Sequence, residues 1–222
     1  MRSPARHDLA WLDRANWLSG LRAPLPDASL AWLDEWFAQH RPAVVTRQDD
    51  ADRSSLRLGV AMPPSRGKCR IALAVDPAVV SCVRAPLRLR DAVASAPPMW
   101  KPALADLLAS AAQCGVEFAV YGSLAWQHLS GESFVTSTSD VDLLWTAADP
   151  VLLDKVIALL LAWEQRSGLR ADGEVLLPDG AAVAWKELLR RPRMLLVKHA
   201  TGVELRAAAA VLSFRGTAQC SI

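Results

Sequence analysis

The pattern of apolar and polar positions divides the chain into two regions. In the first region, apolar residues recur at helical spacing over residues 28–40, and Pro42 follows them. Asp27 precedes this helix in the manner of an N-cap. Extended segments are predicted at 43–48, 56–62 and 69–75, and the run 63–67 predicts a hairpin-like turn between the last two. This pattern predicts a small N-terminal α/β domain over residues 1–90.

Helical and extended patterns alternate in the second region, residues 91–222. Helices are predicted at 99–114, 123–129 and 149–166, and strands at 117–121, 141–145, 174–177 and 194–199. Asp179 and Gly180 predict a tight turn after the third of these strands. Strand, helix, strand and helix in succession are typical of an α/β unit. The second region is therefore predicted to be a mixed sheet flanked by helices.

Composition and charge exclude several classes of protein. The 222 residues are 52% hydrophobic and 22% charged, as in an ordinary globular protein, and the net charge of +2 gives no general affinity for nucleic acid. The longest uncharged apolar stretch, residues 156–163, is too short to span a bilayer. We expect a cytoplasmic protein with no membrane partner. The four cysteines form no C-x-x-C pair, so we expect reduced, mostly buried thiols: Cys69, Cys82, Cys114 and Cys220.

Two aspartates one residue apart are the main candidates for chemistry. Asp140 and Asp142 flank Val141, and in a strand the side chains of residues i and i+2 point to the same face. Two neighbouring carboxylates repel each other when both are ionised, and a divalent cation removes that cost. Hard carboxylate oxygens suit Mg²⁺, which keeps waters and phosphate oxygens as its other ligands. The sequence therefore predicts a magnesium site and phosphate chemistry.

A Gly-Ser pair precedes the aspartates. Gly122 allows the backbone to leave a strand sharply, and Ser123 begins a predicted helix whose free N–H groups attract phosphate. Nucleotidyl transfer usually needs a third carboxylate, for a second metal or as general base, and Glu174 is the candidate, with Asp172 as its rival. Further basic candidates for phosphate are Lys186 and Lys198, and those for the donor or a carrier protein are Arg66, Lys68 and Arg70.

These motifs resemble those of a known family. Gly122-Ser123 followed by Asp140-Val141-Asp142 is similar to the nucleotidyltransferase fold shared with DNA polymerase beta, although the spacer here is longer than is common. The surrounding segments are more specific, and they resemble the phosphoribosyl-dephospho-CoA transferase of malonate decarboxylase over nearly the whole chain. They are 6–12, 41–45, 67–73, 121–127, 136–145, 172–175, 177–180 and 183–188.

The resemblance implies a reaction. The donor would be 2'-(5''-triphosphoribosyl)-3'-dephospho-CoA, and the acceptor a serine on the acyl-carrier subunit of malonate decarboxylase. Pyrophosphate would leave, and the prosthetic group would remain joined through a phosphodiester. Asp140 and Asp142 would be the catalytic, metal-binding pair, and Glu174 would complete the acidic cluster or deprotonate the serine.

Two other functions remain open at this point. Another small nucleotidyltransferase, using ATP on a drug, protein or RNA acceptor, would share the acidic pair but would lack the family-like N-terminal region. A non-catalytic scaffold on a transferase fold is a third reading, and the intact Asp140, Asp142 and Ser123 argue against it.

Overall fold

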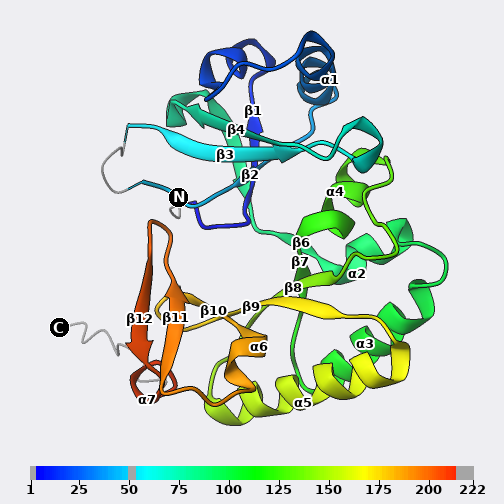
Figure 1. Cartoon of the computed structure of the whole chain (residues 1–222), viewed down its shortest axis with the longest axis vertical. Coiled ribbons are helices and arrows are strands. Elements are labelled where there is room, and N and C mark those ends of the chain that lie inside the picture. The colour runs from blue at the N-terminus through cyan, green and yellow to red at the C-terminus, as the bar shows by residue number, and fades with distance from the viewer. Residues whose placement is uncertain (1–3, 50–53, 214–222) are drawn as a thin grey trace. The chain divides into compact units, whose positions relative to one another are not determined.

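The computed structural model describes residues 4–49 and 54–213 and divides them between two compact units (Figure 1). Unit 1 contains the chain up to Leu87 together with residues 126–134 and 200–202. Unit 2 contains residues 88–125, 135–199 and the chain from Val203 onwards. The sequence-based boundary lay between residues 90 and 91. No described helix is long and apolar enough to cross a membrane.

Unit 1 is built on an antiparallel sheet of five strands in the order β4-β3-β2-β1-β5. These strands are β1 (Leu9–Leu12), β2 (Ala43–Val45), β3 (Leu56–Ala61), β4 (Arg70–Val75) and β5 (Val80–Arg84). Alternate residues of β3 and β4 are buried, and they belong to one apolar cluster with four buried residues of α1 (Asp27–Ala38). The apolar faces of the sheet and of α1, predicted from period-2 and helical spacing, thus pack against each other.

Of two local predictions for the first region, one is confirmed and one is wrong. The hairpin between β3 and β4 is confirmed, with Gly67 in the left-handed conformation at φ 91°. The predicted N-cap is wrong: Asp27 is the first helical residue, and Pro26 precedes it without a side-chain capping bond. Proline at that position fixes an extended backbone, so the helix starts directly after it.

Unit 2 is built on a mixed sheet of seven strands in the order β12-β11-β10-β9-β8-β7-β6. β8 and β9 run parallel, whereas β7–β8, β9–β10, β10–β11 and β11–β12 are antiparallel. The strands are β6 (Leu87–Arg88), β7 (Ala119–Val120), β8 (Val141–Thr146), β9 (Ala171–Leu176), β10 (Ala182–Ala184), β11 (Met194–Lys198) and β12 (Val203–Ala207). The predicted mixed α/β class is confirmed.

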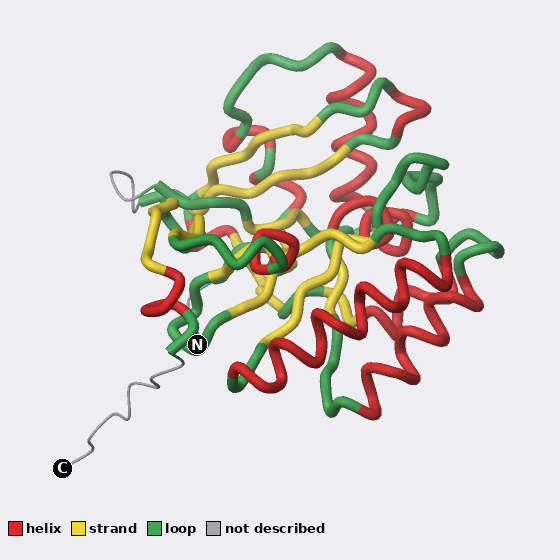
Figure 2. The backbone as a smooth tube through the Cα atoms, turned by 60° about the horizontal axis from the view of Figure 1, so that its bottom comes forward, coloured by secondary structure: helices red, strands yellow, loops and turns green. Residues whose placement is uncertain are grey.

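Two long helices, α3 (Lys101–Gln113) and α5 (Pro150–Ser167), lie side by side against one face of this sheet (Figure 2). The Trp163 indole donates a hydrogen bond of 2.7 Å to the Ala103 carbonyl, which joins the two helices. The shorter helices are α2 (Leu89–Ala92), α4 (Gly122–Ser130), α6 (Trp185–Leu188) and α7 (Ala208–Val211). The covered sheet face is apolar and almost completely buried: Val141, Leu143, Trp145, Ala171, Val175, Val183, Leu195 and Val197.

The start of β9 corrects the sequence prediction. The strand begins at Ala171, not at Glu174, and pairs with β8 along its whole length. Gly173 breaks the apolar pattern, but a glycine is required there. Its φ is 132°, and a Cβ would lie 1.8 Å from the Leu143 carbonyl oxygen.

The thiols are less buried than expected. Cys69 is exposed and Cys82 and Cys114 are partly exposed, all three as free thiols, while Cys220 lies outside the described residues. The expectation of mostly buried thiols is wrong for these three.

Candidate active site

Asp142 lies in β8, and Asp140 immediately precedes this strand. Both carboxylates are half-buried, and Val141 between them is completely buried in the opposite face of the sheet. This is the alternation expected of a strand, so the two acids emerge on the face that α3 and α5 leave uncovered.

The start of α4 lies directly against Asp142. The Tyr121 N–H donates to the Asp142 carbonyl at 3.1 Å, and the chain then turns at Gly122, whose φ is 64°. A Cβ on Gly122 would lie 1.8 Å from Asp142 Oδ2, so only glycine fits at this point. Negative charge at a helix N-terminus is favoured by the free N–H groups and the helix dipole. Ser123 follows as the second residue of α4.

The parallel register places two carboxylates opposite each other. Asp142 of β8 pairs with Asp172 of β9, and like charges directly opposite on neighbouring strands destabilise a sheet. Asp172 is exposed, and its Oδ1 accepts a 2.8 Å hydrogen bond from the Gly173 N–H. A cation between Asp142 and Asp172 would remove this repulsion.

Arg170 lies beside Asp140 just before β9. Its Nε is 2.6 Å from Asp140 Oδ1, and its Nη2 donates a 2.9 Å hydrogen bond to the Thr138 carbonyl. The Nε–H does not point at the carboxylate, so the contact is an ion pair without a hydrogen bond. Asp140 Oδ1 is buried and has no hydrogen-bond partner among the described residues. This oxygen is therefore available to a stronger ligand.

Glu174 lies on the same sheet face, opposite Leu144, but its surroundings differ from those of Asp172. It is only 4% exposed, and its Oε1 accepts a 2.7 Å hydrogen bond from Lys198 Nζ. Glu174 and Lys198, both predicted site residues, therefore bind each other. The other predicted lysine, Lys186 in α6, lies 3.3 Å from Glu164 of α5 and over the Trp185 ring.

The basic candidates of the first region lie in unit 1. Arg66 forms an ion pair of 3.5 Å with Glu132, which also accepts a hydrogen bond from the Trp32 indole. Lys68 is exposed in the turn before β4, and Arg70 is exposed as the first residue of β4. Their predicted role with donor or carrier stays a prediction.

Comparisons with known proteins cover both units. The family model described as phosphoribosyl-dephospho-CoA transferase MdcG N-terminal domain matches residues 5–86, and that of the C-terminal domain matches residues 88–209. A phosphoribosyl-dephospho-CoA transferase of Xanthomonas campestris (strain 8004) is 41% identical over 90% of this chain and 92% of its own length. One from Bradyrhizobium diazoefficiens is 38% identical over 89% of this chain and 87% of its own. No solved structure gives a significant match to the chain.

The chain belongs to the phosphoribosyl-dephospho-CoA transferase family. Membership of a transferase family indicates an enzyme, and it agrees with the family that the sequence motifs resemble.

The acidic residues of this family member fit a divalent cation in their chemistry. No three His, Cys, Asp or Glu side chains of the described residues are arranged as a complete metal site. However, Asp140 Oδ1 lacks a hydrogen-bond partner among the residues described, and Asp142 and Asp172 face each other. Carboxylate oxygens are the ligands that Mg²⁺ prefers.

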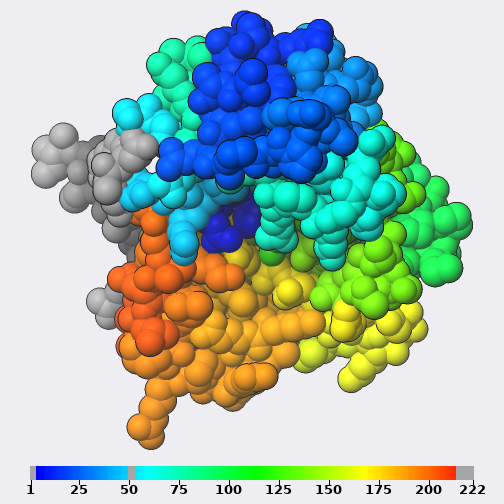
Figure 3. Space-filling view, turned by 45° about the horizontal axis from the view of Figure 1, so that its top comes forward, coloured from blue at the N-terminus to red at the C-terminus, as the bar shows by residue number. Residues whose placement is uncertain are grey.

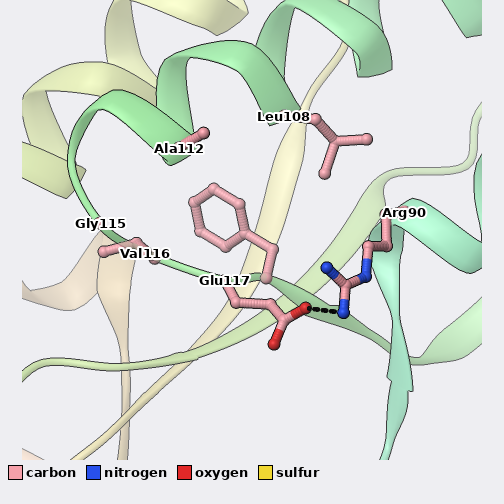
Figure 4. Close-up of a pocket in the computed structure, with 7 residues that line it drawn as sticks. Arg90, Leu108, Ala112, Gly115, Val116 and Glu117 are labelled. Atoms are coloured by element: carbon pink, nitrogen blue, oxygen red, sulfur yellow. Dashed lines mark ion pairs between the residues drawn. The ribbon is translucent and has the colours of Figure 1, made fainter.

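A pocket in unit 2 lies away from the acidic residues. It has a volume of about 400 Å³, and Phe118 is among its lining residues. An Arg90–Glu117 ion pair of 3.0 Å lies at its edge (Figure 4). Phe118 contacts Trp145, whose side chain is on the sheet face opposite to Asp142. This pocket is therefore separate from the candidate active site.

Sequence reasoning missed Arg170 and ranked Asp172 below Glu174. Asp172 lies in the family-like segment 172–175 and Arg170 lies outside such segments, and only the structure places them beside Asp142 and Asp140. The run Arg170-Ala171-Asp172 shows only that charged residues alternate with an apolar one, which does not specify its pairing with β8.

Proposed function

We propose that this enzyme transfers the 2'-(5''-triphosphoribosyl)-3'-dephospho-CoA prosthetic group to a serine of the apo acyl-carrier subunit of malonate decarboxylase, in the cytoplasm and with Mg²⁺. The family match supports the donor chemistry. The observation that carries the proposal is the Asp142 carboxylate, which lies against the start of α4 and opposite Asp172. An anionic cluster beside a helix N-terminus is suited to a metal-bound triphosphate.

The reaction forms one bond and breaks one. The serine oxygen attacks the phosphorus nearest the ribose, and the bond from that phosphorus to the oxygen bridging to the next phosphate breaks. Pyrophosphate leaves with the electron pair, and the serine proton passes to a carboxylate. The prosthetic group ends in a phosphodiester.

The residues present divide these tasks. Asp140 and Asp142 would hold Mg²⁺, whose positive charge offsets the charge that develops on the phosphate oxygens. Gly122 and Ser123 would present the N–H groups of α4 to the outer phosphates. The exposed Asp172 is better suited than Glu174 to take the serine proton, because Glu174 is buried and already bound to Lys198.

The test is mass spectrometry of the purified apo acyl-carrier subunit after incubation with the enzyme, the donor and Mg²⁺. The proposal expects the acceptor to gain the mass of the whole prosthetic group, with one pyrophosphate released per acceptor. Omitting Mg²⁺ and adding a chelator should abolish the gain. An unmodified acceptor with active donor and Mg²⁺ would contradict the proposal.

The match of the N-terminal family model to residues 5–86 favours this function over a small nucleotidyltransferase that uses ATP. The same assay with ATP in place of the CoA derivative separates the two. Transfer of AMP to an acceptor, without use of the dephospho-CoA donor, would favour the alternative.

A further inference from the structure

An apolar row is exposed on strands β11 and β12. It consists of Met194, Leu196, Val203 and Leu205, whose exposed fractions lie between 38% and 64%. The register pairs Leu196 with Leu205, so these side chains share one face of the hairpin. The intervening Leu195 and Val197 are completely buried on the other face. A contiguous exposed apolar patch of this kind marks an interaction surface.

Three exposed arginines adjoin the apolar row. Arg190, Arg191 and Arg193, here called the arginine turn, form no ion pair with any described residue. The turn is held by the Arg190 and Arg191 N–H groups, which donate to carbonyls of α6. The Glu187 carboxylate also accepts a 2.9 Å hydrogen bond from the Leu196 N–H, which fixes the turn to β11.

The apolar row lies on the same sheet face as Asp142 and Asp172. Asp142 pairs with Asp172, Glu174 pairs with Ala184, and Ala182 pairs with Lys198. Because paired residues point to the same side, Lys198, Leu196 and Met194 lie on the face of Asp142 and Asp172. At the level of Lys198, three strand spacings of about 4.8 Å, roughly 14 Å in all, separate Leu176 of β9 from Val203 of β12.

We propose that the apolar row and the arginine turn form the docking surface for the acceptor protein, and that this protein presents acidic side chains around an apolar contact. The inference rests on the proposed function. An exposed apolar centre with unneutralised cations at its rim suits an acidic partner with an apolar face. A partner that covers the area of a standard interface there, about 800 Å² on each side, also reaches the acidic residues. The orange part of Figure 3, around residues 190–200, shows this segment at the surface.

Two variants test the surface separately. The double variant Arg190→Glu/Arg193→Glu reverses charge and leaves Arg191 unchanged, because the Arg191 backbone is left-handed with φ 43°. The variant Leu205→Asp places a charge in the apolar row. Lys155→Glu and Val151→Asp on α5, both exposed and on the helix-covered side of the sheet, are matched controls. Circular dichroism and thermal unfolding identify any variant that fails to fold.

Binding of labelled apo acceptor is measured by fluorescence anisotropy without donor, and the transfer assay gives KM for acceptor and donor. Each test variant should raise the acceptor Kd and KM at least about tenfold, a loss of 1.4 kcal/mol. The donor KM, and kcat at saturating acceptor, should not change. The controls should behave as the unmodified enzyme.

The outcomes separate the docking surface from the proposed function. Unchanged acceptor binding in both test variants, with normal transfer by the unmodified enzyme, overturns the surface alone. If the unmodified enzyme binds the acceptor through this surface but transfers nothing, the proposed function fails and the surface stands. A dimer that Leu205→Asp dissociates, with acceptor binding unchanged, would show instead that a second copy covers the row.

Discussion

At the scale of single residues, Asp142 combines two unfavourable features, a facing carboxylate and partial burial. Asp142→Asn keeps the shape of the side chain and removes its charge. We expect the transfer rate to fall at least about 100-fold, the magnitude found when one stabilising group is lost from a charged transition state. The free energy of unfolding without metal should not fall, and it should rise by up to about 1 kcal/mol because the repulsion from Asp172 is relieved.

The matched control for this change is Asp154→Asn, an exposed acid on α5. Transfer kinetics and chemical denaturation are measured on both variants. A destabilised Asp142→Asn enzyme that retains its activity would contradict both halves of the prediction.

Arg170 would compete with the proposed cation for Asp140 Oδ1, which lies 2.6 Å from the Arg170 Nε. Removing the guanidinium in Arg170→Gln should therefore tighten Mg²⁺ or Mn²⁺ binding. Because the Arg170 side chain is exposed, its ion pair with Asp140 contributes about 0.2–1 kcal/mol, so the increase in affinity should be at most about fivefold. Isothermal titration of the protein with metal alone measures it. Weaker metal binding in Arg170→Gln would mean that Arg170 supports the site instead of competing with the cation.

The residues that the sequence could reveal are those whose signal is local. Asp140, Asp142 and Gly122 lie in short motifs, and the structure brings Gly122 and Asp142 together. Arg170 has no local signal, and Asp172 has none that ranks it above Glu174. Their positions depend on a parallel pairing between segments separated by a long helix, which hydrophobic periodicity does not specify.

At the scale of elements, the turn from β7 into α4 depends on Gly122. Gly122→Ala would place a methyl group on Asp142 Oδ2 in addition to straining a backbone with φ 64°. We expect the unfolding free energy to fall by about 1–3 kcal/mol and transfer to fall as Asp142 is displaced. Gly168→Ala is the control, because it has φ 69° but nothing within 4 Å of its Cβ. Equal losses in the two variants would show that strain alone, without the contact to Asp142, explains the effect.

The turn between β9 and β10 makes stability depend on pH through Asp179. Burial alone would raise the pKa of Asp179, but hydrogen bonds from the Ala181 N–H and from Arg206, with the charges of Arg206 and His199, lower this pKa below its ordinary value. A lowered folded-state pKa adds stability above the unfolded pKa of about 3.9, and this stability is lost as pH falls through the folded value.

Asp179→Asn should therefore be less stable than the unmodified protein at pH 7, and the difference should shrink as the pH falls below 4. Denaturation curves of both proteins across this range measure it. A difference that stays constant with pH would assign the effect to the turn geometry and not to the charge of Asp179.

Long, periodic elements were predictable, and short or irregular ones were not. The helices α1, α3 and α5 agree with the apolar spacing to within about two residues at each end. β10 and β12 were not predicted. β10 has only three residues before α6 begins, and β12 alternates apolar with polar residues but exposes its apolar side chains Val203 and Leu205.

At the scale of the whole molecule, the net charge of +2 conceals a separation of charge within unit 2. Acids gather near the starts of β8 and β9, whereas the arginine turn directly precedes β11. Composition reports only the sum of these charges, so it excluded a general affinity for nucleic acid but revealed neither cluster. The family models match residues 5–86 and 88–209. This agrees with the resemblance that the sequence motifs showed over nearly the whole chain.

We expect a cation held by Asp140 and Asp142 to make the thermal stability of the protein depend on the Mg²⁺ concentration. Cations that bind only the folded state stabilise it by about 2.7 kcal/mol at a concentration 100 times their Kd. Chelator-treated protein should therefore unfold at a lower temperature than protein with excess Mg²⁺, and the shift should grow with the logarithm of the Mg²⁺ concentration. The double variant Asp140→Asn/Asp142→Asn should show no such shift, since the carboxylates that attract the cation are gone. K⁺ at matched ionic strength controls for screening. A shift of the same size with K⁺, or in the double variant, would mean that Mg²⁺ acts by screening charge and not at Asp140 and Asp142.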